Sequence, residues 1–249
     1  MFGNIPILSS ICRGNTSLVI GASFSTSKRK GMTMIKGVVF DLDGLIFNTE
    51  DVFIRATNEF LLPLGLEYED QVRRRMMGQQ ADVSLQILKD HYRLAHTIIE
   101  IRSGIEANFI AALPEMLNVM PGFEELRTYL IHQSIPMAVC TSSSSIYAEQ
   151  LLEEFGYLKE FEFVLGAEDV ENGKPAPDCY HLACRRLDLL PGQVMVFEDS
   201  ENGCRAAVEA GTFAVAVPGS HNCGHNYLGA SLVANSLADP RIKMALQKS

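Results

Sequence analysis

Short apolar runs recur along the chain, and several of them end at acidic or hydroxyl side chains. The runs cover residues 35–40, 136–140, 161–165, 194–197 and 213–217. Apolar runs of this length that stop at polar or turn-forming residues are typical of strands buried inside a sheet. The sequence therefore predicts five buried strands.

A different period fills the stretch from about residue 51 to residue 117. Apolar residues there recur at three- and four-residue steps, as Phe53, Ala56 and Phe60 do, which is the spacing of one face of a helix. No convincing strand interrupts this stretch. Further helices are predicted to start at residues 121–122 and to cover residues 177–187 and 201–210.

Beyond residue 120 the predicted strands alternate with predicted helices. This alternation predicts an α/β fold with a Rossmann-like, doubly wound parallel sheet. In such sheets ligands bind in the crevice beyond the carboxyl ends of the strands. Three strand ends carry polar pairs, namely Asp41 and Asp43, Thr141 and Ser142, and Glu198 and Asp199. We expect these side chains to face one crevice although they lie far apart in the sequence.

Composition and charge are those of an ordinary soluble globular protein. The 249 residues fit one domain with an insertion or two small domains, and 47% are hydrophobic and 20% charged. The formal net charge is -9, and because residues 1–33 hold four cations and no acid, the remainder carries -13. Such an acidic body repels a phosphate backbone, so we expect no nucleic-acid partner. No apolar run reaches the ~18 residues of a membrane span, so we expect no membrane partner, and we take a monomer as the default.

The first 33 residues differ from the rest of the chain. They are rich in Ser and Thr and carry a basic cluster, Lys28, Arg29 and Lys30, which is typical of an organelle transit peptide. The alternative is a disordered or untranslated leader, with the natural start at Met32 or Met34. The six cysteines form no CxxC pair, which favours reduced thiols and a cytoplasmic protein. A transit peptide would instead direct the protein to the mitochondrion or another organelle.

One cluster near the carboxyl end has the donor types of a soft-metal site. His221, Cys223 and His225 alternate in a stretch rich in Gly and Asn. A structural zinc site needs four ligands, and no fourth is apparent. We therefore favour a solvated loop over a metal site here.

The four acids at the strand ends suit a hard divalent cation. Carboxylate oxygens are the ligands that Mg²⁺ prefers, and Mg²⁺ is commonly held by one or two carboxylates together with a substrate phosphate. Holding Asp41, Asp43, Glu198 and Asp199 close together without a cation would cost free energy through charge repulsion. We therefore predict a Mg²⁺ site made by these residues.

The same crevice has the groups that phosphoryl transfer needs. Asp41 can attack phosphorus and form an aspartyl phosphate. Asp43, two residues later, can protonate the departing alcohol and then deprotonate the attacking water. The candidates for holding the phosphate oxygens are Gly44, Thr141, Ser142 and Lys174, through hydroxyl groups, backbone amides and the lysine charge.

Each of these features also has a purely structural interpretation. Asp-Leu-Asp-Gly can be a simple turn, and residues 141–145 and 198–200 can cap the helices that follow them. A lone lysine is usually solvated. Their joint occurrence, in this order and at three strand ends, favours the catalytic interpretation.

Four segments together resemble the motifs of the haloacid dehalogenase superfamily. They are Asp41-Leu-Asp43-Gly44, Thr141, Lys174 in GKPAPD, and Glu198-Asp199 in VFEDSENG. The resemblance is greatest to the branch with a helical cap, which contains pseudouridine 5'-phosphatase, sugar phosphatases and β-phosphoglucomutase. It implies a Mg²⁺-dependent phosphatase with Asp41 as nucleophile, Asp43 as acid and base, and the cation on Asp41, the Asp43 carbonyl and Asp199, with Glu198 nearby. It also implies a core over residues 34–50 and 118–249 and a cap over residues 51–117, with residues 1–33 outside both.

Departures from that branch narrow the expected reaction. The β-phosphoglucomutase members have a His at the position of Phe53 and, near Ala81, an Arg that holds a second phosphate. This chain has neither residue, so a phosphatase is favoured over the alternative of a sugar phosphomutase. An inactive binding protein is the second alternative, and it would need a broken motif. Asn48 stands where many members of the family have an Asp. Residues 76–80 resemble the cap loop that meets the substrate, and the roles of Gln79 and Gln80 stay open. The substrate is expected to be a small phosphate ester such as a sugar phosphate or a nucleoside-type monophosphate.

Overall fold

The computed structural model describes residues 34–76, 81–222 and 224–247. Its centre is a six-stranded, fully parallel sheet in the order β3-β2-β1-β4-β5-β6. The strands are β1 Gly37–Phe40, β2 Met137–Cys140, β3 Phe161–Leu165, β4 Val194–Glu198, β5 Phe213–Ala216 and β6 Leu232–Val233. The predicted doubly wound α/β fold is therefore confirmed, with one short edge strand, β6, that was not predicted.

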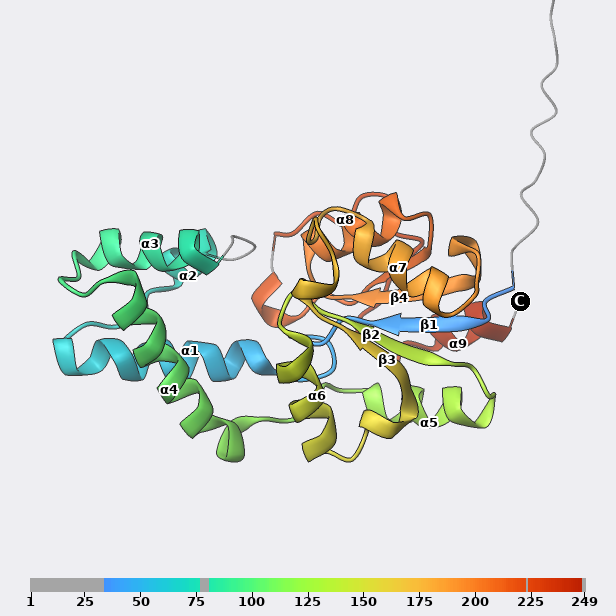
Figure 1. Cartoon of the computed structure of the whole chain (residues 1–249), viewed down its shortest axis with the longest axis horizontal. Coiled ribbons are helices and arrows are strands. Elements are labelled where there is room, and N and C mark those ends of the chain that lie inside the picture. The colour runs from blue at the N-terminus through green and yellow to red at the C-terminus, as the bar shows by residue number, and fades with distance from the viewer. Residues whose placement is uncertain (1–33, 77–80, 223, 248–249) are drawn as a thin grey trace, which may run out of the picture. The chain divides into compact units, whose positions relative to one another are not determined.

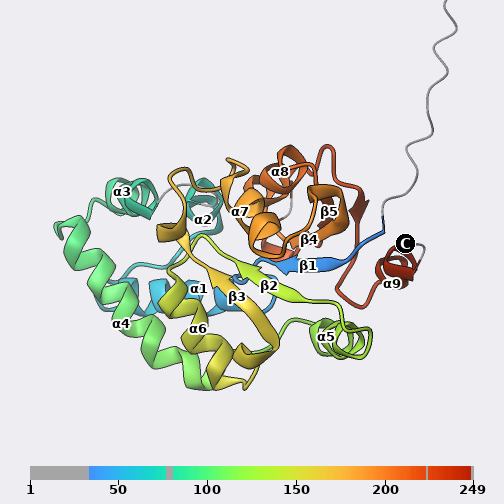
Figure 2. The same ribbon diagram turned by 45° about the vertical axis from the view of Figure 1, so that its right-hand side comes forward.

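Helices cover both faces of this sheet (Figures 1 and 2). On one side lie α7 (Asp178–Arg186) and α8 (Glu201–Glu209), and on the other lie α5 (Phe123–His132), α6 (Ser145–Glu154) and α9 (Pro240–Gln247). Short 3₁₀ helices occur at η1 Leu62–Leu64, η2 Leu158–Glu160, η3 Ala167–Asp169, η4 Pro191–Gln193 and η5 Ser220–Asn222. Burial on both faces explains why the strands are continuous apolar runs rather than alternating ones.

Successive residues of β1 show how the two layers of core form. Val39 belongs to the cluster on the side of α7 and α8. Val38 and Phe40 belong to the cluster on the other side, where the Phe40 ring stacks on Phe197 at 5.1 Å and meets Phe123 of α5 edge-on at 5.5 Å. This alternation is the two-residue period of a strand. It fixes the register of β1 and so the position of the residue that follows it, Asp41.

Four helices are inserted between β1 and β2, beyond the carboxyl ends of the strands (Figure 1). They are α1 (Thr49–Leu61), α2 (Asp70–Met76), α3 (Ala81–Tyr92) and α4 (Ile98–Met116). This insertion has an apolar cluster of its own, which includes Leu61, Leu88 and Ile101. In the described residues of the stretch 51–117 the structure has the predicted helices. No helix in the described part of the chain is long and apolar enough to cross a bilayer.

Asn48 ties together the two chain segments that enter and leave the insertion. Its backbone N–H donates to the carbonyl of Asn118, and its side-chain oxygen accepts from the Asn118 N–H at 2.6 Å. Its side-chain amide also donates to the Met116 carbonyl at 3.2 Å. A carboxylate could accept but not donate, so the asparagine that departs from the family pattern has a defined use at this junction.

Candidate active site

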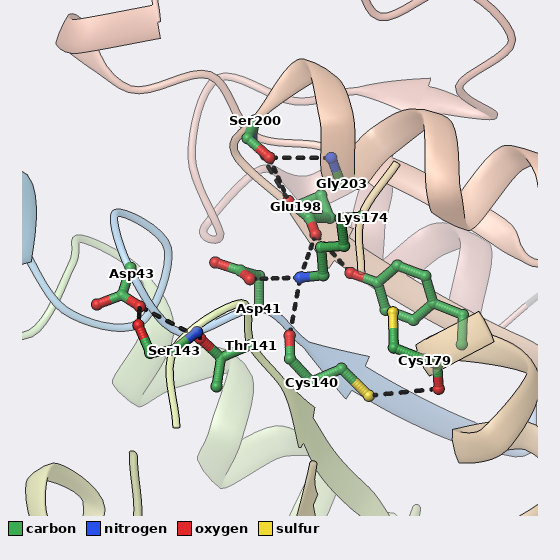
Figure 3. A network of polar contacts seen from close by, with 11 residues as sticks. Asp41, Asp43, Cys140, Thr141, Ser143, Lys174, Cys179, Glu198, Ser200 and Gly203 are labelled. Carbon is green, nitrogen blue, oxygen red and sulfur yellow. Dashed lines mark hydrogen bonds and ion pairs between the residues drawn. The ribbon is translucent and has the colours of Figure 1, made fainter. Parts of the chain in front are cut away.

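The carboxyl ends of β1, β2 and β4 place acids and hydroxyls at one edge of the sheet (Figure 3). Asp41 follows β1, Thr141 follows β2, and Glu198 ends β4 with Asp199 next to it. Backbone hydrogen bonds hold these positions, since the Asp41 N–H donates to Phe197 and the Thr141 N–H donates to Leu165. The side chains that the sequence placed at three strand ends therefore lie at one edge of the sheet.

Lys174 reaches this edge from the loop before α7 (Figure 3). Its Nζ lies 2.5 Å from Oδ1 of Asp41, 2.7 Å from Oε1 of Glu198 and 2.9 Å from the carbonyl oxygen of Cys140. Only 5% of the lysine side chain is exposed. The ammonium group thus joins the ends of three neighbouring strands, β1, β2 and β4.

The carboxylate of Glu198 is fully enclosed by protein groups. Tyr180 of α7 donates its hydroxyl to Oε1, and Ser200 donates its hydroxyl to Oε2 at 3.0 Å. Gly203 leaves room for this carboxylate, because a Cβ there would lie 1.8 Å from Oε1. Sequence reasoning missed Tyr180 and Gly203, which approach Glu198 from two separate helices. The sequence did predict a helix N-cap within residues 198–200. Ser200 is that cap, since its hydroxyl accepts the Gly203 N–H at the start of α8.

Burial dominates the electrostatics of the site. It raises the pKa of Asp41 to about 8, with Glu198 and Asp43 adding to the effect and Lys174 opposing it. Burial also raises the pKa of Asp199, and the charges of Asp41 and Glu198 raise it further. For Lys174 burial lowers the pKa, but Asp41 and Glu198 outweigh it, so that the pKa stays above its ordinary value. At Asp41 the lysine charge is thus outweighed by burial together with the neighbouring acids.

Asp43 lies to one side of this group and is held by hydroxyls (Figure 3). Ser143 donates to its Oδ2 at 2.7 Å and Thr141 donates to the same oxygen at 3.2 Å. The hydroxyl of Tyr147 lies 3.5 Å from Oδ1. Ser143 and Tyr147 were not predicted, although Ser143 belongs to the polar run after β2. The expected capping role in that run falls to Ser144, which accepts the Tyr147 N–H.

Asp199 is fixed by the loop after β5. The side-chain amide of Asn222 donates to its carbonyl oxygen at 2.9 Å and to its Oδ2 at 2.7 Å, and Tyr227 donates to the same carbonyl oxygen at 2.6 Å. Gly44, at φ +78°, passes so close that a Cβ would lie 2.5 Å from Oδ2 of Asp199. Gly44 is therefore needed both for its backbone conformation and for this contact.

The buried acids fit a divalent cation. Oxygens of Asp41, Glu198 and Asp199 lie within 4.8 Å of one another, and all three residues are buried. Among the described residues, this is the one group of three or more His, Cys, Asp or Glu side chains that lie close enough to share an ion. Hard oxygen donors and surplus negative charge are what Mg²⁺ requires.

Of the other residues singled out by the sequence, Ser142 and Ala81 are exposed. His221 contacts Asp51, whereas Nδ1 of His225 faces the N–H of Glu201. Cys223, Gln79 and Gln80 lie outside the described residues. The described cysteines, Cys140, Cys179, Cys184 and Cys204, are buried and free.

Comparison with known proteins agrees with this geometry. The family model described as haloacid dehalogenase-like hydrolase matches residues 38–217, and the chain belongs to this family. It is 34% identical to the validoxylamine A 7'-phosphate phosphatase of Streptomyces hygroscopicus subsp. limoneus, over 76% of this chain and 88% of that protein. It is 32% identical to a probable pseudouridine-5'-phosphatase of Drosophila melanogaster, over 84% of this chain and 93% of that protein.

Solved structures show the same likeness. CbbY from Rhodobacter sphaeroides in complex with phosphate matches with a TM-score of 0.69 at 28% identity, over 82% of this chain and 96% of that chain. A putative beta-phosphoglucomutase from Thermotoga maritima matches with a TM-score of 0.72 at 28% identity, over 86% and 97%. These structures share both the sheet and the helical insertion, since each match covers nearly the whole of the other chain.

Proposed function

We propose that the protein is a Mg²⁺-dependent phosphatase that hydrolyses a small phosphorylated metabolite through an aspartyl phosphate on Asp41. The observation that carries this proposal is the buried contact between Asp41 and Lys174, with Asp199 beside it and Asp43 two residues further on. The substrate class is a sugar phosphate or a nucleoside-type monophosphate. Relatives named as phosphatases of phosphorylated small molecules support this class.

The cation would be held by Asp41, Asp199 and the backbone carbonyl of Asp43. Glu198 is less suited to direct contact, because Tyr180, Ser200 and Lys174 already occupy its two oxygens. We therefore assign Glu198 to holding Lys174 in place. When bound there, the cation would neutralise charge on the phosphate oxygens and on the surrounding carboxylates.

Asp41 supplies the attacking oxygen. Its position at the end of a central strand fixes the carboxylate, and Lys174 contacts Oδ1. The second oxygen is then the one available to attack phosphorus, with the P–O bond to the leaving alcohol breaking as the new bond forms. Lys174 also brings a positive charge to the place where the phosphate oxygens bind, and the amides and hydroxyls of Gly44, Thr141 and Ser142 supply further donors.

Asp43 handles the proton. In its acid form it protonates the leaving alcohol, and as the carboxylate it then takes a proton from the water that hydrolyses the aspartyl phosphate. The hydroxyls of Thr141 and Ser143 hold its Oδ2 on the side of β2. They keep the carboxyl within reach of the crevice without adding a charge beside Asp41.

The inserted helices are proposed to be the cap that closes over the substrate and selects it. They lie beyond the carboxyl ends of the strands, where the substrate of a doubly wound protein binds. The chain passes between the core and these helices through the two segments that Asn48 joins. This arrangement supports the proposed division into a core of residues 34–50 and 118–249 and a cap of residues 51–117.

A phosphate-release screen with Mg²⁺ over sugar, nucleoside and cofactor phosphates tests the function. We expect free phosphate from at least one class, and an isomerised phosphate ester would instead indicate a mutase. Asp41→Asn should lower kcat by at least about 10³-fold, because the amide is a poor nucleophile. Asp90→Asn is the matched control, since Asp90 is exposed on α3. Full activity in Asp41→Asn would contradict the mechanism.

A further inference from the structure

A chain of polar contacts connects the insertion to the loop that fixes Asp199. Arg73 of α2 lies with its Nη1 3.0 Å from Nδ1 of His221 in η5. Nε2 of the same histidine lies 2.6 Å from Oδ1 of Asp51 in α1. Two helices of the insertion thus meet one side chain of the core.

The donors and acceptors in these contacts follow from their chemistry. A guanidinium group has donors and no acceptor, so Nδ1 of His221 must accept from Arg73. The proton of the neutral ring is then on Nε2, which donates it to Asp51. Both ring nitrogens are therefore used, and the orientation of the imidazole is fixed from α1 and from α2. Asp70 in turn holds Arg73, with its Oδ1 3.0 Å from Nε.

Asn222, the residue after His221, contacts Asp199 from the same loop. Asn222 is only 7% exposed, and its amide group holds both the carbonyl and the Oδ2 of Asp199. Because the two residues are adjacent in one short turn of 3₁₀ helix, a shift of His221 moves the amide that orients the Asp199 carboxylate. The contact with the insertion and the contact with Asp199 are thus separated by a single peptide unit.

We propose that His221 is a positioning residue that couples docking of the insertion to the orientation of Asp199 for a divalent cation. This inference rests on the metal site of the proposed function. Coupling between two binding events is reciprocal, so cation binding favours the docked insertion, and the docked insertion favours cation binding. Partners that orient a metal ligand change metal affinity by about 10–100-fold when they are removed.

Two neighbouring arginines allow this idea to be tested with a matched control. Arg73 and Arg74 both lie on α2 and both pair with Asp70. The Arg73 side chain is 17% exposed and contacts His221, whereas the Arg74 side chain is 70% exposed. Replacing either one by alanine removes the same charge from the same helix, but only Arg73→Ala breaks the link to the core.

The experiment is a calorimetric titration of MgCl₂ into the full chain without substrate. Arg73→Ala is expected to weaken Mg²⁺ binding by about 3–10-fold, less than loss of a direct partner of the ligand would, while Arg74→Ala stays within about twofold of wild type. His221→Ala should weaken Mg²⁺ binding as much as Arg73→Ala does. The double variant should bind Mg²⁺ no more weakly than either single variant, because both substitutions remove the same Arg73–His221 contact. His221→Gln, whose amide can both accept and donate, should recover part of the loss.

The outcomes separate this inference from the proposed function. If Arg73→Ala and His221→Ala bind Mg²⁺ as tightly as Arg74→Ala does, the coupling is wrong while the metal site stands. If wild type does not bind Mg²⁺, or if Asp199→Asn binds it equally well, the metal site itself is wrong and the inference falls with it. Circular dichroism of each variant establishes that the fold is intact, and His221→Gln supplies a second variant that keeps the size and polarity of the site.

Discussion

The core crevice and the helical insertion handle charge in opposite ways. In the crevice, the side chains of Lys174, Asp41 and Glu198 are 5%, 10% and 1% exposed. In the insertion, the pair of Arg102 and Asp82 is 36% and 82% exposed. Buried pairs are strongly destabilised when one partner is removed, whereas exposed pairs contribute little. The difference indicates that loss of a charge should be far more costly in the crevice than on the surface of the insertion.

The largest effect should come from Lys174→Met. This change leaves the buried carboxylates of Asp41 and Glu198 without their cation, which should lower the free energy of unfolding by about 3–5 kcal/mol. Phosphate release should also fall steeply, since the charge that faces the phosphate is lost. Chemical denaturation and steady-state kinetics measure the two effects. Lys159→Met, at an exposed position, is the control and should change neither.

Mg²⁺ should stabilise the protein more strongly as the pH rises. Burial raises the pKa of Asp41 from 3.8 to about 8, so the folded chain holds this proton more tightly than the unfolded chain does. Without the cation, the free energy of unfolding therefore falls as the pH rises between these values. The cation needs the ionised carboxylate, and at 100 times its Kd it adds about 2.7 kcal/mol. Unfolding at pH 6 and pH 8, with and without MgCl₂, measures this, and a stabilisation that is larger at pH 6 would count against the site.

Gly203→Ala tests how tightly the core encloses Glu198. The new methyl group would overlap the carboxylate, and such overpacking typically costs about 1–3 kcal/mol. Displacing Glu198 also frees Lys174, so activity should fall together with stability. Gly219→Ala provides the comparison, because no atom lies within 4 Å of a Cβ placed there. Equal stability of the two variants would show that the crevice is looser than described.

Thr97→Ala should have the smallest effect and should be confined to the insertion. Thr97 accepts the Glu100 N–H at 3.2 Å at the start of α4, and Glu100 accepts the Thr97 N–H at 2.7 Å. Loss of such a cap costs about 1 kcal/mol. We expect a small drop in melting temperature and an unchanged kcat, while Thr97→Ser keeps both. A large loss of kcat in Thr97→Ala would contradict the division of roles between core and insertion.

The sequence predicted the parts of the site that follow directly from strand positions. Asp41, Thr141 and Glu198 could be placed because an apolar run ends just before each of them, and parallel strands bring their carboxyl ends to one edge. Tyr180 and Gly203 could not, because they lie within helices and meet Glu198 only through tertiary packing. The short strand β6 and the terminal helix α9 also escaped prediction. Two residues are too few to produce a periodic signal.

The contacts between the insertion and the core could not be predicted from the sequence either. The helices of the insertion were predicted from their period, yet the contact of Arg73 with His221 spans 148 positions and has no local pattern. His221 was interpreted as part of a solvated loop, and the structure instead places it against two helices of the insertion. The double use of Asn48 as donor and acceptor was likewise visible only once the entering and leaving segments were seen side by side.

In the proposed mechanism the phosphoryl group passes through Asp41. The stereochemical course at phosphorus, followed with a substrate whose phosphate is chiral by oxygen isotopes, tests this most directly. Transfer to Asp41 and then to water comprises two in-line displacements, so net retention of configuration is expected. Net inversion would mean that water attacks the substrate directly, and it would contradict the role assigned to Asp41.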